Sequence, residues 1–168
     1  KDGKKHGPVI YLYLADKEFK GDTYVGEYMD DIKNGQGTYI WKDGSKYTGN
    51  WLDNNQDGQG IYIYPDGSKE VGEFKNGLRE GLHKEWFRSG HLKDEINYYN
   101  GNKNGEFKYW DDRGQLVKEG HYVNGELDGF IKEWYHNGNI KLEVNYKAGL
   151  MHGPVSYTHL RAHETTLD

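Results

Sequence analysis

Short segments in which apolar and polar residues alternate recur along the whole chain, and glycine-rich breaks separate them. Clear examples are Tyr24–Met29, Thr38–Trp41, Ile61–Tyr64, Phe107–Trp110 and Ile131–Tyr135. These segments are short and rich in Tyr, Trp, Ile and Val. A two-residue alternation in such runs is typical of β-strands. The pattern therefore predicts an all-β chain, and the frequent glycines argue against helices.

The breaks between these segments are asparagine–glycine or aspartate–glycine dipeptides. They are Asp43-Gly44, Asp66-Gly67, Asn76-Gly77, Asn100-Gly101, Asn124-Gly125 and Asn137-Gly138. Such dipeptides tolerate the positive φ angles that tight hairpin turns require. We therefore expect each pair of neighbouring strands to form an antiparallel hairpin.

Glycine also recurs at fixed distances. Gly35, Gly58, Gly81, Gly105, Gly129 and Gly153 are separated by 23, 23, 24, 24 and 24 residues. A second series, Gly44, Gly67, Gly90, Gly114 and Gly138, steps by the same 23, 23, 24 and 24 residues. Two series in phase indicate one unit copied end to end. The expected fold is a single elongated antiparallel β-meander of about six to seven hairpin repeats, roughly 60 Å long.

The repeat period also predicts the boundaries of the units. They lie near residues 1–23, 24–46, 47–69, 70–93, 94–117 and 118–141, with a partial unit at 142–154. The first connection carries about five extra residues near Ala15–Lys20. The third unit has His83 where the two units before it have Gly37 and Gly60.

Alternation within the strands predicts what each face of the sheet carries. Tyr24, Gly26 and Tyr28 share one face, and the missing side chain of Gly26 leaves room for neighbouring rings. The glycines expected to shape the repeats are Gly26, Gly35, Gly37, Gly49, Gly58, Gly60, Gly72, Gly81, Gly105, Gly129 and Gly153. The expected aromatic packing or binding face comprises Tyr24, Tyr28, Tyr47, Trp51, Phe74, Trp86, Tyr98, Trp110, Tyr122, Trp134 and Tyr146. Polar residues such as Glu27, Asn50 and Glu73 are expected on the other face.

The units resemble a known repeat. Residues 24–46 and 47–69 both begin Tyr-x-Gly-x-aromatic and share Gly-Gln-Gly followed by Asp-Gly-Ser-Lys. This is similar to the MORN (membrane occupation and recognition nexus) repeat. Glu70–Pro154 resembles more loosely the variant of that repeat common in bacterial proteins. The resemblance implies protein–protein contacts, often including self-association.

Composition and charge narrow the classes of function. Only 34% of the residues are hydrophobic, but 15 tyrosines, 5 tryptophans and 5 phenylalanines can bury large areas in a thin core. The net charge is −5 without a basic block, so no nucleic-acid partner is expected. Cysteine is absent, and no apolar run approaches the roughly 20 residues of a membrane span. The compartment stays open, with the cytoplasm favoured.

The C-terminal residues carry an apparent metal-binding pattern, with His159, His163 and Glu164 at helical spacing. However, residues 155–165 resemble the in-frame translation of a transposon-based sequencing adapter at every position. We therefore expect residues 155–168 to be artefactual and outside the fold, and the natural chain to continue past Pro154.

The remaining candidate residues predict no catalytic, metal or cofactor site. His6 and His152 precede equivalent repeat glycines, several units apart. His83, His91, His121 and His136 lack matching ligand spacing. The pairs Asp30-Asp31 and Asp111-Asp112 fall at expected turns, where aspartate is structurally favoured.

The sequence thus predicts a non-enzymatic interaction or scaffold module that presents a repeated aromatic and polar β-surface to a protein partner or to a second copy. Three alternatives remain. A membrane-lipid role would require a basic strip, which Lys33, Lys46, Lys69, Lys75 and Lys84 could form only if they share a face. An antitoxin-like protein would neutralise its partner by binding, and a repeat arm would belong to a larger enzyme.

Overall fold

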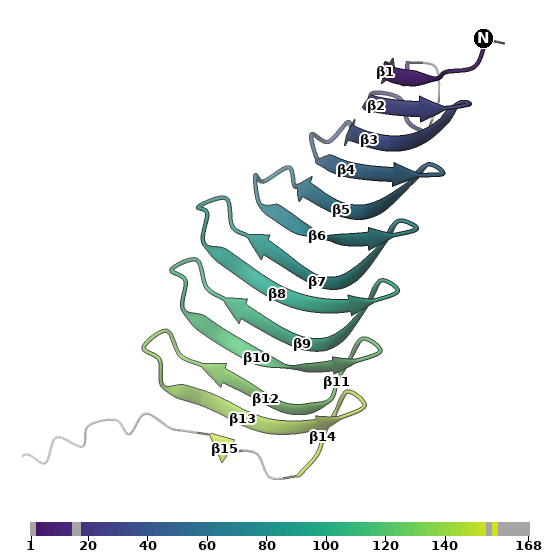
Figure 1. The fold of residues 1–168 in the computed structure, drawn as a ribbon. Helices are drawn as coiled ribbons and strands as arrows, with labels where there is room; N and C mark the ends of the chain where they lie inside the picture. Colours follow the sequence, from purple (N-terminus) through teal and green to yellow (C-terminus); the bar gives the residue numbers. More distant parts are fainter. Residues whose placement is uncertain (1–2, 15–17, 154–155, 158–168) are drawn as a thin grey trace, which may run out of the picture.

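The computed structural model describes residues 3–14, 18–153 and 156–157, and it contains one long antiparallel sheet (Figure 1). Its strands are β1 (Gly7–Leu12), β2 (Thr23–Met29), β3 (Ile32–Ile40), β4 (Lys46–Leu52), β5 (Asn55–Ile63), β6 (Lys69–Lys75), β7 (Leu78–Trp86), β8 (Leu92–Tyr99), β9 (Asn102–Trp110), β10 (Leu116–Val123), β11 (Glu126–Leu127), β12 (Gly129–Trp134), β13 (Ile140–Lys147), β14 (Leu150–Met151) and β15 (Ser156–Tyr157). Each main strand pairs with the next along the chain, as the repeat pattern predicted.

Two kinds of turn connect the strands, and they lie on opposite sides of the strip (Figure 1). In the first kind, Asn76-Gly77 and its equivalents have positive φ at both residues, 50° and 79°. In the second kind, glycine alone is left-handed, as at Gly44 (φ 89°). There the preceding aspartate acts through its side chain, since Asp43 Oδ1 accepts hydrogen bonds from the amide and hydroxyl of Ser45. Both kinds fix the register of the strands they join.

The first glycine series lies inside the strands and not at the turns. Gly35, Gly58, Gly81 and Gly105 have φ between 67° and 109°, within the second strand of each hairpin. The register of each hairpin shifts at that level, as between Gly49 and Trp51 in the pairing of β4 with β5. A β-bulge bends a strand and increases its twist. The bends visible in β3, β5, β7 and β9 are therefore a product of the repeat itself (Figure 1).

The sheet has an aromatic face, which we define by the buried side chains of Tyr24, Tyr47, Phe107 and Ile131. In the first units, rings lie directly over glycine. A Cβ added to Gly37 would come within 2.6 Å of the Tyr24 ring, and one on Gly60 would come within 2.4 Å of the Tyr47 ring. Glycine is thus required at these positions because a ring occupies the space of a side chain.

From the third unit on, the ring over the glycine comes from the other strand of the hairpin. Tyr47 of β4 is replaced by Glu70 of β6, and the space over Gly72 is filled by His83 of β7. In the same way, Phe107 and Ile131 fill the space over Gly120. This exchange explains why the later units lack the second glycine of the Gly-x-Gly pattern.

The exchange divides the interior into two apolar clusters. The first contains Tyr24, Tyr28, Tyr39, Tyr47, Trp51 and Phe74, and the second contains Ile96, Phe107, Ile131 and Val144. The buried rings of the first cluster pack mainly edge to face, as between Tyr47 and Trp51 at 5.4 Å and 89°, whereas Phe107 of the second cluster lies tilted against Tyr122 at 40°. The polar residues Glu70, His83 and Asp94 are buried between the two clusters.

One expectation about placement needs correction. Trp86 pairs with Lys69, and the side chain of Lys69 lies on the opposite face of the sheet from that of Glu70. Trp86 and the equivalent residues Trp110 and Trp134 therefore lie on the face away from Tyr24. Trp86 lies three positions after His83 in the same strand, and an odd step along a strand places two side chains on opposite faces. Of residues 155–168, which we expected outside the fold, the structure describes Ser156–Tyr157, and these two pair with β13. His159, His163 and Glu164 lie outside the described residues.

Candidate functional site

The aromatic face of the first units carries an open row of rings beside its buried core. Tyr39, Trp41, Tyr62 and Tyr64 follow one another across the strands, with ring centroids 4.8, 5.2 and 4.7 Å apart. Trp41, Tyr62 and Tyr64 are half-buried, so each ring presents part of its surface to solvent. Among the described residues, no helix or second sheet covers them.

Two hollows adjoin this row and share Gln56 and Gly77. One has a volume of about 250 Å³ and is bordered by Phe19, Lys33, Trp41 and Trp51. The other has a volume of about 300 Å³ and is bordered by Tyr62, Tyr64, Phe74 and Arg79. Neither border includes a carboxylate, although acidic residues outnumber basic ones in the chain. We call these two hollows and the ring row the aromatic groove.

Lys33 supplies the cationic group of the first hollow. Its Nζ lies 4.4 Å from the centroid of the Tyr39 ring and 4.8 Å from that of Trp51. No ion pair joins it to a carboxylate within the described part of the chain. Burial lowers the pKa of Lys33 to about 8, although the charge of Asp22 opposes this shift. The ammonium is thus charged at neutral pH, and the charge of Asp22 acts on it without a direct ion pair.

Lys33 belongs to a repeated position that alternation did not reveal. The equivalent residues two places before the bulge glycines are Lys5, Lys33, Gln56, Arg79 and Lys103. Lys5 lies 3.5 Å from the centroid of Tyr11, and Lys103 lies 5.2 Å from that of Tyr122. Only Gln56 interrupts this row of cations over rings, and it does so between the two hollows. The sequence signal was the spacing of 23 to 24 residues from Lys33 onward, after a first step of 28 residues from Lys5.

Arg79 is bound by the buried polar cluster between the two cores. Its Nη2 donates to Glu70 Oε2 at 2.7 Å, and its Nε donates to Oε1 of the same carboxylate. Tyr64 donates its hydroxyl hydrogen to Glu70 as well. Burial alone would raise the pKa of Glu70, but the hydrogen bonds from Arg79, His83 and Tyr64 hold it well below its usual range. Glu70 is therefore ionised.

His83 completes this cluster, and each of its two ring nitrogens has a hydrogen-bond partner. Nδ1 lies 2.7 Å from Glu70 Oε1, and Nε2 lies 2.7 Å from the carbonyl oxygen of Glu73. Both partners are acceptors, so both ring nitrogens must carry hydrogen to satisfy them. From the sequence, we inferred only that His83 lacks the spacing of a metal ligand. In the structure, it is a buried group that holds this cluster together.

Asp94 lies one strand further along, next to Glu85 in the cross-strand register. Burial, and next the charge of Glu85, raise the pKa of Asp94 to about 6, while Lys93 and Lys103 act in the opposite direction. Glu85 itself accepts a hydrogen bond from Lys93 Nζ at 2.6 Å. The neighbouring carboxylates of Asp94 and Glu85 affect the stability of the fold, but no nucleophilic side chain accompanies them among the described residues.

The expected site residues fall into three groups. Tyr24, Tyr28, Tyr47, Trp51 and Phe74 are buried in the first cluster, so they support the groove from below. Tyr98, Tyr122 and Tyr146 are half-buried on the same face beside the second cluster. The third group is the set of tryptophans on the opposite face. Alternation alone missed Trp41, Tyr62 and Tyr64, which form the open row.

The other predicted candidates are dispersed. Asp30 and Asp31 have φ of 50° and 70° and lie in a hairpin turn. Within the described ranges, no group of His, Asp or Glu is arranged to hold a metal ion. The basic strip does not form on one face, since Lys33 lies over the aromatic rings whereas Lys46 and Lys69 lie on the other side. No described helix is long and apolar enough to cross a membrane.

Comparison with known families matches models of one repeat and its variant to two parts of the chain. A model of the MORN repeat matches residues 24–46 and 47–69. A model of the MORN repeat variant matches residues 79–100, 103–124 and 127–148. The change from one model to the other coincides with the exchange of Tyr47 for the Glu70–His83 pair. No curated protein matches the chain.

Proposed function

Because this chain belongs to the family of MORN-repeat proteins, we propose that it is a non-enzymatic interaction module whose aromatic groove binds an extended segment of a partner protein. Repeats of this family are common in interaction and membrane-associated proteins. The observation that carries the proposal is the open row of Trp41, Tyr62 and Tyr64, which continues the buried ring of Tyr39 beside two hollows.

The groove has the composition of a protein-binding surface. Tyrosine and tryptophan are enriched at interfaces because they bury large apolar areas and still present a polar group. The side chains of Asn54, Asn55 and Gln56 border the first hollow and can donate and accept hydrogen bonds. The ammonium of Lys33, which lies over the Tyr39 and Trp51 rings, favours an acidic residue on the partner. A lipid surface is disfavoured, since anionic headgroups would meet a chain of net charge −5.

The proposal is tested by photo-crosslinking from each face. A photoreactive amino acid replaces Tyr62 in the groove or, as a matched control, Ile61, which is 42% exposed on the opposite face of the same strand. The Tyr62 probe is expected to capture one dominant protein in the producing cells, and the Ile61 probe is not. Equal capture from both faces would contradict a groove-specific role.

The captured protein is then purified and its affinity for variants is measured. Trp41→Ala is expected to weaken binding by ten-fold or more, the range of an aromatic hot spot of about 1.4 kcal/mol and above. Ile61→Ala should leave the affinity unchanged. Titration with anionic vesicles tests the lipid alternative, which would be favoured if Trp41→Ala lowers vesicle binding and no protein is captured.

A further inference from the structure

The face opposite to the groove carries a row of alternating charges across its C-terminal half. One charged residue stands on each of six neighbouring strands, and each is the cross-strand partner of the next. We call this row the charge ladder; it consists of Lys84, Glu95, Lys108, Glu119, Lys132 and Glu143. Ion pairs join Lys84 to Glu95 at 2.7 Å and Lys132 to Glu143 at 3.0 Å. The ladder has three positive and three negative charges in strict alternation.

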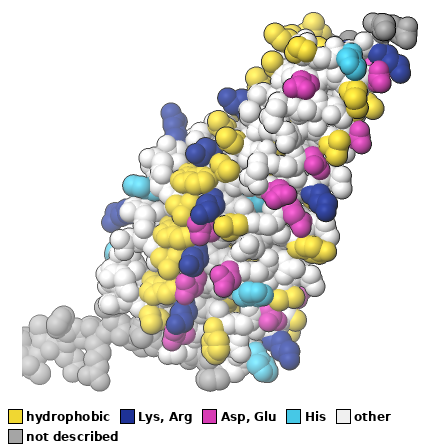
Figure 2. All heavy atoms as spheres, viewed as in Figure 1, with side chains coloured by type: hydrophobic (Ala, Val, Ile, Leu, Met, Phe, Trp, Pro, Cys, Tyr) yellow, Lys and Arg dark blue, Asp and Glu magenta, His cyan; other side chains and the backbone are white. Residues whose placement is uncertain are grey.

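Apolar side chains flank the ladder on both sides. One flank is a column of half-buried residues near the strand ends: Trp86, Leu92, Trp110, Leu116, Trp134 and Ile140. Figure 2 shows this hydrophobic column beside the alternating basic and acidic side chains. The other flank carries Leu82, which is 45% exposed, and Phe130, which is 73% exposed. Together with the hydrophobic column, these side chains form an exposed apolar surface rimmed by charges, which is typical of an interaction site.

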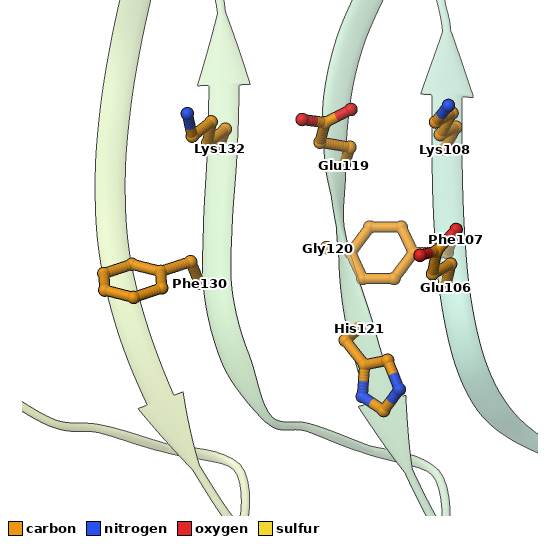
Figure 3. Close-up of a pocket in the computed structure, with 8 residues that line it drawn as sticks. All are labelled: Glu106, Phe107, Lys108, Glu119, Gly120, His121, Phe130 and Lys132. Atoms are coloured by element: carbon orange, nitrogen blue, oxygen red, sulfur yellow. The ribbon is translucent and has the colours of Figure 1, made fainter.

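Two hollows lie on the same face. The larger, about 400 Å³, is bordered by Lys108, Glu119, His121 and Phe130, at the middle of the ladder (Figure 3). In the close-up, the Phe130 ring points away from Glu119 and His121. The smaller hollow, about 110 Å³, is bordered by Leu82, Glu95 and Asn97. The face therefore combines one protruding ring with a separate recess.

We propose that this face binds a second copy of the chain, about a two-fold axis that runs parallel to the strands between β9 and β10. This axis reverses the order of the ladder. Lys84 then opposes Glu143 of the second copy, Glu95 opposes Lys132, and Lys108 opposes Glu119. Every contact joins opposite charges, and each occurs twice, as an isologous interface requires. A two-fold axis along the ladder would instead oppose each charge to its own copy.

The same operation matches the flanking residues. The column of tryptophans meets the equivalent column of the second copy. On the other flank, Glu106 opposes His121, and Phe130 opposes Asn97, which borders the smaller hollow. Phe130 of each copy thus enters the recess beside Leu82 of the other. Two sheets stacked with aligned strands are a common packing arrangement.

A second copy explains the surface better than a partner of one charge sign. A membrane or a nucleic acid would select a ladder of uniform positive charge, whereas this ladder sums to zero. Three outward residues on each of six strands give about 18 residues per copy, near the lower end of the usual 20–30. The dimer is therefore concentration-dependent, and it leaves the aromatic groove on the outside of both copies.

The decisive experiment reverses all six charges at once: Lys84→Glu, Glu95→Lys, Lys108→Glu, Glu119→Lys, Lys132→Glu and Glu143→Lys. This ladder-reversed chain keeps every opposite-charge pair within the sheet, so it should fold like the wild type. It should also dimerise with itself. When mixed with the wild type, however, it brings like charges together at every opposed position.

Sedimentation equilibrium and energy transfer between differently labelled full chains measure the outcome. Each chain is expected to form homodimers, with mixed dimers at least ten-fold less abundant than random pairing gives. Random mixing, or a wild type that stays monomeric up to about 1 mM, overturns the proposal.

Phe130→Ala provides a second, independent test. It should weaken dimerisation ten-fold or more without lowering the unfolding midpoint of the monomer, because the ring is exposed there. Ile61→Ala, an apolar truncation on the same face outside the ladder, is the matched control and should change neither quantity. A Phe130→Ala chain that dimerises like the wild type overturns the assigned interface.

Discussion

At the scale of single residues, Asp94 is the group whose charge most directly opposes folding. It is only 8% exposed, and its nearest charged neighbour in the register is Glu85. Its pKa of about 6 lies above the usual value of 3.8 for an aspartate side chain. The folded chain therefore binds a proton more readily than the unfolded chain at this position. Its contribution to stability is greatest below the unfolded pKa and is lost as the pH rises through about 6.

This sign gives a prediction for Asp94→Asn. The substitution should raise the free energy of unfolding at pH 7.5 by about 1–3 kcal/mol, since it removes the cost of a buried charge. At pH 4 the gain should vanish. Urea unfolding at several pH values measures both. A loss of stability at pH 7.5 would mean that the carboxylate makes favourable contacts that outweigh its burial.

The sequence already contained part of the residue-scale picture. The glycines under Tyr24 and Tyr47 could be predicted because a ring and a missing side chain share one face. The Glu70, Arg79 and His83 cluster could not, because three substitutions in one unit become meaningful only when their side chains meet across strands. The tryptophans were assigned to the wrong face, although parity counted from Gly60 to Ile63 would have placed the equivalent Trp86 correctly.

At the scale of the hairpin, two kinds of glycine have different roles, and a matched pair of substitutions separates them. Gly60→Ala should cost about 3 kcal/mol, because the new Cβ would lie 2.4 Å from the Tyr47 ring. Gly44→Ala should cost only about 1 kcal/mol, because its Cβ would meet open space and only its φ of 89° is unfavourable. Thermal and chemical unfolding of both variants provides the comparison. Equal losses would show that backbone conformation, and not ring packing, sets the requirement at Gly60.

Hairpin boundaries were the part of the fold best predicted from sequence. Turns at Asn76-Gly77 and its equivalents have a local cause, so short-range chemistry was sufficient. The bulge glycines were recognised as a series but not as bulges. Their positive φ arises from pairing with the neighbouring strand, which a single segment does not reveal.

At the scale of the whole molecule, the two apolar clusters predict that the strip unfolds in parts. Each repeat contacts only its neighbours, so stability is a sum of local terms. Phe107→Ala, which removes a ring with 1% exposure, should destabilise the second cluster by about 3–5 kcal/mol. Hydrogen exchange should then show lost protection in β8 to β13 and retained protection in β2 to β5. Uniform loss along the chain would contradict separate clusters.

The buried cluster of Glu70, Arg79 and His83 has a consequence for how such chains change length. On one side of this cluster, the first strand of each hairpin supplies the ring that lies over the glycine. On the other side, the second strand supplies the side chain that fills this space. Duplicating or deleting a unit within either region reproduces an existing neighbour contact. Splicing residues 47–69 directly onto residues 94–117 would instead place two incompatible fillings side by side. The third unit thus connects two packing arrangements of the same repeat, and recombination that removes it would leave those arrangements in direct contact.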